Sequence, residues 1–362
     1  MPSSLSPIAS RTLLVRVHNG PALSVQLPRL RAYALAGDPV PLSRDPAWLS
    51  VLERAFGHEI YALEAVDGEQ TCGFLPLAFV RSLLFGRFLI SLPYLNTNGV
   101  LADDDEARGR LIDRAVRLAD ELRVRYLELR HEQKVDHPAL TGALASKCHM
   151  RLALPEFPGP LWEGLSGKVR NQVRKAEKSG LTVAHGGEEL LPEFYSVFSR
   201  NMRDLGTPVY SAGLFAGALR QFPSDAELFV VRAERKPVAA ALLLHGRGVT
   251  EVPSASALRQ YNPTCANMLL YWKLLERAVE RGQAVFDFGR STIDGNTYRF
   301  KKQWGATPAP AVWQYYRPGG EAAVADDPRP ENPRYQRLIR IWQRLPVRLT
   351  RWIGPAIVRG IP

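Results

Sequence analysis

The sequence contains few cysteines and lacks long apolar runs. Cys72, Cys148 and Cys265 are its three cysteines, and they lie far apart without the spacing of a metal site. We therefore expect neither a zinc site nor a disulfide framework. The first 20 residues lack the basic start and apolar run of a secretory signal, and no later stretch is apolar over the length of a membrane span. These absences predict a cytoplasmic protein.

Acidic residues are in the minority. The 362 residues include 47 Lys and Arg against 36 Asp and Glu, which gives a formal net charge of +11. Such an excess attracts nucleic acid, phosphorylated small molecules or an anionic membrane face, and it does not choose among them. The hydrophobic content of 46% and the charged content of 23% are typical of a soluble globular protein. The basic residues are concentrated at 168–178 and from 329 onward.

Two parts of the chain repeat one order of patterns. Residues 59–130 read as a hairpin with a polar turn, further strand, one amphipathic helix and a final strand, "RYLELR". Residues 227–290 repeat this order and end on "VFDFGR", although chance similarity is the alternative. Strands followed by a helix and a strand imply an α/β fold with a parallel crossover in each half. The Pro- and Gly-rich stretch around residue 155 predicts domains at 1–155 and 156–325, followed by a tail at 326–362.

The stretch "SGKVRNQVRKAEKSG" reads as a basic helix at the start of the second half. Arg170, Arg174 and Lys178 recur at four-residue steps, where like charges repel by a few tenths of a kcal/mol per pair. Arginine is suited to bidentate binding of phosphate. We predict that Arg170, Arg174 and Lys175 bind phosphates of a substrate; a solvated helix face is the alternative.

Three segments resemble FemAB-like proteins, specifically the branch associated with exosortase and PEP-CTERM systems. They are "VRNQVRKAEKSGLTV", "FYSVFSRNMRDLGTPVYSAGLF" and "FDFGRSTIDGNTYRFKKQWG", and the resemblance extends over residues 45–355. It implies two tandem GNAT-like domains, each an α/β unit with a mixed sheet flanked by helices. Well-studied relatives transfer an amino acid from aminoacyl-tRNA to an amine of a peptidoglycan precursor. More distant relatives are acyl-CoA-type N-acyltransferases, and no metal or redox cofactor is implied.

The donor substrate stays open between aminoacyl-tRNA and acyl-CoA. GNAT enzymes that use acyl-CoA carry a glycine-rich turn before a helix, but residues 261–268 contain no glycine. The matching stretch of the first half, "LADDDEARGRL", is acidic and is a poor pyrophosphate site. Aminoacyl-tRNA suits the positive charge, because phosphate contacts dominate affinity for nucleic acid. These features favour a tRNA donor by a small margin.

The chemistry of acyl transfer points to the end of the second half. Transfer to an amine needs a route for its proton and a positive charge at the tetrahedral oxyanion. No Ser/His/Asp or Cys/His arrangement is suggested by local sequence, so we expect direct attack without a covalent intermediate. In Fem-type transferases a lysine after a phenylalanine lies near the transferred acyl group, and the resemblance assigns this role to Lys301, with Lys302 as the alternative. Asp287 is the predicted base or a partner of Arg290; a structural salt bridge is the alternative.

The predicted substrate-binding residues come from several parts of the second half. For Tyr210 core packing is the alternative, and for "NTYRFKKQWGA" an aromatic-anchored surface loop is the alternative. The predicted set is Arg170, Arg174, Lys175, Tyr210, Arg290, Tyr298, Lys302 and Trp304.

The carboxy-terminal residues interleave arginines with apolar side chains, and Pro346 interrupts the pattern. Such a basic amphipathic segment lies on an anionic membrane surface or packs back on the second domain. We predict an N-acyltransferase that modifies an amino group of a cell-envelope, peptidoglycan or exopolysaccharide precursor, with peripheral contact to the inner face of the cytoplasmic membrane. An acyl-CoA-dependent enzyme and a non-catalytic envelope scaffold are the alternatives. The sequence leaves the oligomeric state open.

Overall fold

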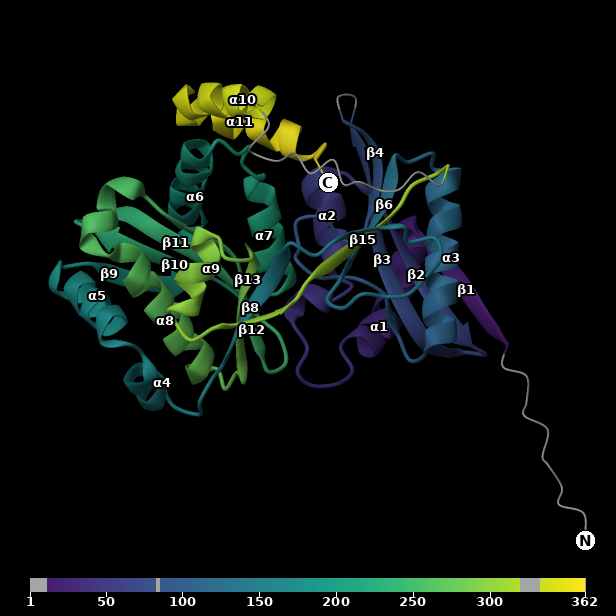
Figure 1. The fold of residues 1–362 in the computed structure, drawn as a ribbon, viewed down its shortest axis with the longest axis horizontal. Coiled ribbons are helices and arrows are strands. Elements are labelled where there is room, and N and C mark those ends of the chain that lie inside the picture. The colour runs from purple at the N-terminus through teal and green to yellow at the C-terminus, as the bar shows by residue number, and fades with distance from the viewer. Residues whose placement is uncertain (1–11, 83–84, 320–332, 362) are drawn as a thin grey trace, which may run out of the picture.

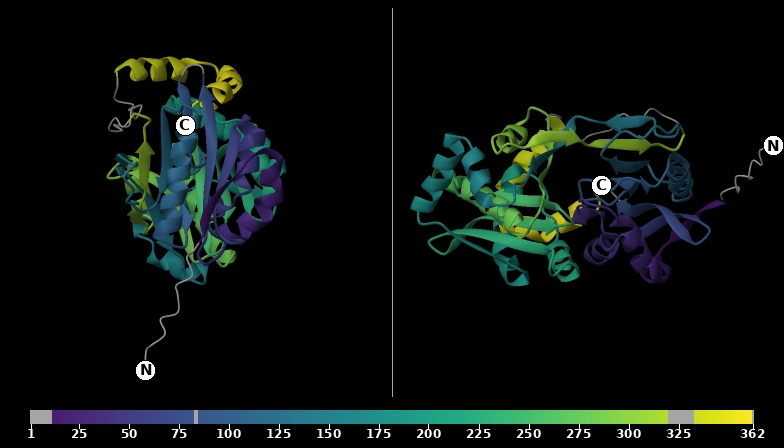
Figure 2. Two further views of the ribbon diagram at one scale, coloured as in Figure 1. Left: turned by 90° about the vertical axis from the view of Figure 1, so that its right-hand side faces the viewer. Right: turned by 90° about the horizontal axis from the view of Figure 1, so that it is seen from below.

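The computed structural model describes residues 12–82, 85–319 and 333–361, although the side chains of residues 333–335 lie outside the description. Two α/β halves lie side by side (Figure 1). Two carboxy-terminal helices lie across one end of the molecule (Figure 2).

The first half is built on one mixed sheet. Its strands follow the order β1-β2-β3-β4-β6-β15-β7, β5 pairs with β3, and β4 and β6 are parallel. Helices α1 and α2 pack on β2 and β3, and α3 also packs on these strands, within a separate hydrophobic cluster. The bounds are β1 Leu13–His18, α1 Gly20–Ala34, α2 Trp48–Phe56, β2 Glu59–Asp67, β3 Gln70–Ser82, β4 Gly86–Ile90, β5 Leu101–Ala102, α3 Asp105–Glu121, β6 Tyr126–His131, β7 Gly142–Leu144 and β15 Val312–Tyr316.

The second half has the same construction. Its sheet follows the order β14-β8-β13-β12-β11-β10-β9, with β12 and β13 parallel. Helices α6 and α7 belong to one hydrophobic cluster, whereas α5 and α8 belong to another. The bounds are β8 Lys147–Ala153, α4 Pro158–Gly164, α5 Gly167–Lys178, β9 Thr182–Gly186, α6 Leu191–Leu205, α7 Ala212–Gln221, β10 Ala226–Ala233, β11 Lys236–His245, β12 Val249–Ala257, α8 Ala266–Glu280, β13 Val285–Thr292, α9 Asn296–Lys302 and β14 Thr307–Pro310. Short 3₁₀ turns lie at Leu42–Arg44, Glu188–Leu190 and Arg259–Thr264.

The repeated order predicted from the sequence is confirmed. Each half contains a hairpin, a third strand, a helix and a strand parallel to the third, β2-β3-β4-α3-β6 in one and β10-β11-β12-α8-β13 in the other. The apolar face of α8, formed by Leu269, Trp272, Leu275 and Val279, is buried as its spacing predicts.

The halves exchange strands at equivalent positions. β8, from the first half of the chain, lies between β13 and β14 in the second sheet, and β15, from the end of the second half, lies between β6 and β7 in the first. The division expected at 155/156 therefore falls after β8, in a loop that leads out of the second sheet. By sheet membership, the chain passes from one half to the other between β7 and β8, and it returns between β14 and β15.

The halves also share one hydrophobic core. A single cluster of buried side chains includes α1 and α2 of the first half and α6 and α7 of the second, with Trp48 and Phe222 in ring contact at 5.2 Å. Helices α2 and α7 pack directly on each other. Burial of this apolar surface holds the two halves in a fixed arrangement.

The parallel strands β12 and β13 separate after three residue pairs. Val249, Thr250 and Glu251 pair with Val285, Phe286 and Asp287, and a register shift then carries β13 along β8. Beyond this point β12 and β13 no longer pair with each other. Glu251 and Asp287 are thus neighbours at the place where the sheet opens.

The carboxy-terminal segment forms two helices, α10 (Pro333–Arg344) and α11 (Val347–Val358), which pack on α6. Residues 326–332 and residue 362 of the predicted tail lie outside the described residues. Within the described chain, no helix has both the length and the apolar character needed to cross a bilayer.

Candidate functional site

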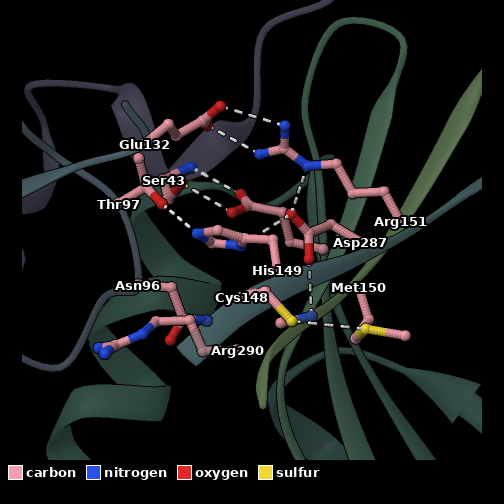
Figure 3. A network of polar contacts seen from close by, with 12 residues as sticks. Ser43, Asn96, Thr97, Glu132, Cys148, His149, Met150, Arg151, Asp287 and Arg290 are labelled. Atoms are coloured by element: carbon pink, nitrogen blue, oxygen red, sulfur yellow. Dashed lines mark hydrogen bonds and ion pairs between the residues drawn. The ribbon is translucent and has the colours of Figure 1, made fainter. Parts of the chain in front are cut away.

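Asp287 lies at the centre of a buried polar network between the halves (Figure 3). Its Oδ2 accepts a hydrogen bond from Arg151 Nε at 2.9 Å and lies 3.2 Å from His149 Nδ1, while Oδ1 accepts from the Gly289 amide at 2.7 Å. Burial alone would raise the pKa of Asp287, but the neighbouring His149 and Arg151 lower it below the ordinary value. Asp287 is therefore a fixed negative charge.

Side chains of the first half complete the network. His149 and Arg151 lie on the exchanged strand β8; Thr97 Oγ1 lies 2.6 Å from His149 Nε2. Glu132 accepts two hydrogen bonds from the Arg151 guanidinium, at 2.8 and 3.1 Å. The network therefore connects the two halves through β8.

Glu251, next to Asp287 on the neighbouring strand, differs from it in ionisation. Its carboxylate accepts hydrogen bonds from the backbone amide and the hydroxyl of Ser43, at 2.9 and 2.7 Å. Burial and the charge of Asp287 nevertheless raise the pKa of Glu251 to about 7. Two adjacent carboxyl groups whose pKa values are pushed apart are typical of acid–base sites.

Lys301 is buried beside β13, where the charge of Asp287 still acts on it. Its ammonium donates to the carbonyl oxygens of Gly289 and Arg290, at 3.0 and 3.1 Å, where β13 changes register. Gly289 adopts a φ of +77° at this bulge, a conformation that favours glycine. Burial lowers the pKa of Lys301 to about 8. An ammonium has three N–H donors, and among the described residues only these two carbonyls accept from Lys301, so one N–H remains for a further acceptor.

The two lysines of "RFKKQWG" have different environments. Lys301 is 7% exposed, whereas Lys302 is exposed and its ammonium lies 5.9 Å from the ring centre of Tyr298. Trp304 and Tyr298 are buried in the core under α8, so this segment is a short helix held by its aromatic side chains. The geometry favours Lys301 over Lys302 as the residue near the network.

The other predicted site residues lie in three places. Arg290 stacks on Trp313 of the exchanged strand β15 at 3.3 Å, next to the network. Tyr210 contacts the Tyr94 ring at 5.4 Å and lines a small apolar cavity between the halves. Arg170, Arg174 and Lys175 lie on α5, at the side of the second half that faces away from the first sheet (Figure 1). The structure thus brings Asp287, Arg290 and Lys301 together and separates the α5 residues from them.

Sequence reasoning missed Glu251, His149 and Arg151. The signal for the last two was the alternation of polar side chains in "KCHMRLA", which places His149 and Arg151 on one face of a strand. Their meeting with Asp287 follows from the strand exchange, which the local pattern does not reveal.

A pocket of about 550 Å³ opens in the first half next to the network. Thr97 and Glu132, which contact His149 and Arg151, also line this pocket. Among the described residues, no cluster of three or more His, Cys, Asp or Glu side chains is arranged to hold a metal ion.

Comparison with protein families and with solved structures agrees with this architecture. Residues 165–302 match the acetyltransferase (GNAT) domain family. The match includes β12, β13, Glu251, Asp287 and Lys301. No curated protein matches the chain in sequence.

Several solved structures have the same fold. FemX is 15% identical with a TM-score of 0.62, over 80% of this chain and 95% of its own. The carboxy-terminal domain of a putative lysylphosphatidylglycerol synthetase from Agrobacterium fabrum is 14% identical with a TM-score of 0.54, over 83% and 95%. A tandem GNAT protein from the clavulanic acid biosynthesis pathway is 13% identical with a TM-score of 0.52, over 84% and 98%. The chain therefore has a FemAB-like fold of two tandem GNAT domains, as predicted.

Proposed function

We propose that the protein is an N-acyltransferase that transfers an aminoacyl or acyl group to an amino group of a cell-envelope, peptidoglycan or exopolysaccharide precursor. The observation that carries the proposal is that Glu251 and Asp287 pair where β12 and β13 separate, while Lys301 donates to the β13 carbonyls of Gly289 and Arg290 just beyond Asp287, all within the GNAT-matched segment. The fold is shared with FemX and with the domain of a putative lysylphosphatidylglycerol synthetase, and together with the resemblance to FemAB-like proteins this supports aminoacyl transfer as the form of the reaction.

Each of the three residues has one role in direct attack by the amine. Glu251 accepts the proton of the attacking amine, because its pKa of about 7 is matched to neutral pH. Lys301 donates its remaining N–H to the oxyanion of the tetrahedral intermediate. Asp287 keeps a negative charge beside both groups, which raises the pKa of Glu251 and favours protonated Lys301.

The local backbone supports aminoacyl-tRNA rather than acyl-CoA as donor. The glycine-free segment before α8 is a 3₁₀ turn in which the amides of Tyr261 and Cys265 donate to the carbonyls of Leu258 and Asn262. These amides are engaged within the turn, so they are not free to hold a pyrophosphate. In the first half, Asp104 caps α3 and accepts from the Ala107 amide at 2.8 Å, which places negative charge at that helix end.

A two-donor assay tests the proposal. The purified chain is incubated with extracted bacterial envelope precursors and either [¹⁴C]aminoacyl-tRNA or [¹⁴C]acetyl-CoA, and label is counted in product that resists mild base, because amides survive where esters hydrolyse. We expect label from the tRNA donor. Label from acetyl-CoA alone would establish the CoA-dependent alternative. The absence of base-stable product with both donors would contradict acyl transfer and would favour the alternative function, a non-catalytic envelope scaffold.

The enzyme should be fully active only over a narrow pH range. We expect kcat/KM to rise with pH as Glu251 loses its proton near pH 7, and to fall as Lys301 loses its proton near pH 8. Steady-state rates between pH 5.5 and 9.5 measure this profile. In the Glu251→Gln variant the residual activity should lose the acidic limb, and an unchanged limb would exclude Glu251 as the base.

We also propose that α10 and α11 bring the enzyme to an anionic membrane. One side of these helices packs on α6, where Arg351 donates to Ser199 at 2.7 Å. Leu338, Ile341 and Trp352 are 61%, 51% and 79% exposed. Residues 333–362 contain seven arginines and no acidic side chain. Exposed apolar side chains among arginines are typical of helices that bind anionic bilayers.

Vesicle co-sedimentation tests this surface. The wild-type chain should sediment with phosphatidylglycerol vesicles and not with phosphatidylcholine vesicles, and the double variant Ile341→Glu/Trp352→Glu should lose most of this binding. Point variants are preferable to deletion of the tail, because deletion would uncover α6. Phe157→Glu, at another exposed aromatic residue, is the matched control. Equal sedimentation of the double variant and the control would contradict membrane contact by the tail.

A further inference from the structure

A short turn of the first half, Leu42–Arg44, is attached to the backbone of the second half. Just before it, Val40 and Arg247 exchange two backbone hydrogen bonds of 2.8 Å, and Arg247 lies in the loop between β11 and β12. A Cβ atom at Gly246 would lie 2.2 Å from the carbonyl oxygen of Val40 and 2.6 Å from the amide nitrogen of Leu42. Any side chain at Gly246 would therefore push the two backbones apart.

The same turn is held from within the first half. Asn98 Nδ2 donates to the carbonyl oxygen of Ser43 at 2.7 Å, and Trp48 Nε1 donates to the carbonyl oxygen of Leu42 at 2.9 Å. Ser43, Asn98 and Trp48 are all buried. Because the turn is bonded on both sides, the backbone and side chain of Ser43 have a fixed position at the boundary between the halves.

Ser43 contacts both carboxyl oxygens of Glu251. Its backbone amide donates to Oε2 at 2.9 Å, and its hydroxyl donates to Oε1 at 2.7 Å. The amide can only donate, so Oε2 must remain an acceptor, whereas the hydroxyl can also turn and accept from a protonated carboxyl group. This arrangement favours Oε1 as the oxygen that gains and loses the proton.

The charged groups that act on Glu251 lie on the neighbouring strands. Burial and the charge of Asp287, on β13, raise the pKa of Glu251, while His149, on β8, lowers it together with the two hydrogen bonds from the turn. Arg44, in the same turn, has its guanidinium 3.8 Å from Glu132. The turn therefore opposes the effects of burial and of Asp287 through hydrogen bonds to the carboxylate.

We propose that Ser43 is a positioning residue for Glu251: from the first half, it fixes the orientation of the carboxyl group and stabilises its ionised form. The carboxyl group of the second half is thus completed by a residue of the first, and a single half would lack this contact. The part of Ser43 in acyl transfer rests on the proposed function, in which Glu251 is the base. Its control over the ionisation of Glu251 does not.

Carbon NMR of the full chain labelled with [5-¹³C]glutamate tests the inference without a transfer assay. The resonance that is absent from Glu251→Gln identifies Glu251, and its titration in the wild-type chain should have a midpoint near pH 7. Ser43→Ala removes the hydroxyl and keeps the amide, so the midpoint should rise by about one pH unit, the effect of one hydrogen bond to a charged group. Ser43→Cys, with a weak S–H donor of similar size, should give a smaller rise.

Ser256→Ala is the matched control, because it removes another buried serine hydroxyl from β12, one that accepts from Asn201 Nδ2 at 3.1 Å. The midpoint of Glu251 should not change in this variant. An unchanged midpoint in Ser43→Ala, or equal shifts in Ser43→Ala and Ser256→Ala, would overturn the inference.

The pH profile of the reaction separates this inference from the proposed function. In Ser43→Ala the acidic limb of kcat/KM should move to higher pH together with the NMR midpoint, because both report the proton of Glu251. A shifted NMR midpoint with an unmoved acidic limb would contradict the proposed function alone, since Ser43 would still control a carboxyl group that is not the base.

Discussion

Replacing Lys301 by methionine should lower the rate of acyl transfer by a factor of about 10² to 10³, the usual loss when one donor to an oxyanion is removed. Methionine keeps most of the apolar length of the side chain but has no N–H to offer. The variant also leaves the carbonyls of Gly289 and Arg290 without their lysine, so we expect a modest loss of stability in a chain that still folds. Rates of base-stable product formation, with circular dichroism as the folding check, measure both effects.

Lys302→Met is the matched control for this variant. Lys302 is exposed and its ammonium lies over Tyr298, so its removal should change the rate less than about threefold. Residual activity in Lys301→Met should also lose the alkaline limb near pH 8, a change that a purely structural lysine would not cause. Full activity in Lys301→Met would refute its assignment to the reacting acyl group.

Replacing Asp287 by alanine should lower the free energy of unfolding by about 3 kcal/mol, since removing one partner of a buried ion pair leaves the others without compensation. Arg151 would keep its ion pair with Glu132, but His149 would lose the carboxylate that lies 3.2 Å from its Nδ1. Urea denaturation at pH 7 measures the difference. Asp136→Ala, at an exposed carboxylate near Lys134, should be unchanged within error.

The same variant should show a defined pH dependence. Because the pKa of Asp287 is lower in the folded protein than its ordinary value of 3.8, its contribution is fully present above that value and is lost as the pH falls below it. The stability gap between wild type and Asp287→Ala should therefore narrow below about pH 4. Between pH 7 and pH 5 the gap should widen slightly, because Glu251, whose pKa the charge of Asp287 raises to about 7, takes up a proton in this range and no longer repels Asp287. A gap that stays constant down to pH 3 would contradict a charge-based role for Asp287.

Much of the fold was predictable because it depends on local patterns. Alternation in the hairpins and the apolar face of α8 predicted two α/β units of one order, and the structure confirms this order. The alternation of Phe286, Asp287 and Phe288 likewise separates the two buried aromatics from the polar network. The strand exchange was not predictable, because β8 and β15 read as ordinary short strands whichever sheet receives them.

The same exchange explains which site residues the sequence could identify. Asp287 and Lys301 belong to one continuous segment, "FDFGRSTIDGNTYRFKKQWG", so a single local sequence motif identifies both. Glu251 is distinguished only by its pairing with Asp287 across two strands, and His149 only by the position of β8 beside β13. The charge stripe of α5 had the clearest local signal, yet α5 packs on α8 away from this group.

The most direct test of the central claim is a crystal structure of the chain with a non-hydrolysable amide analogue of the 3′ end of aminoacyl-tRNA. We predict that its carbonyl oxygen lies about 3 Å from Lys301 Nζ, within hydrogen-bond distance. Its carbonyl carbon should face the opening between β12 and β13, beside Glu251. A complex with the carbonyl group remote from both Lys301 and Glu251 would contradict the claim that this network is the site of acyl transfer.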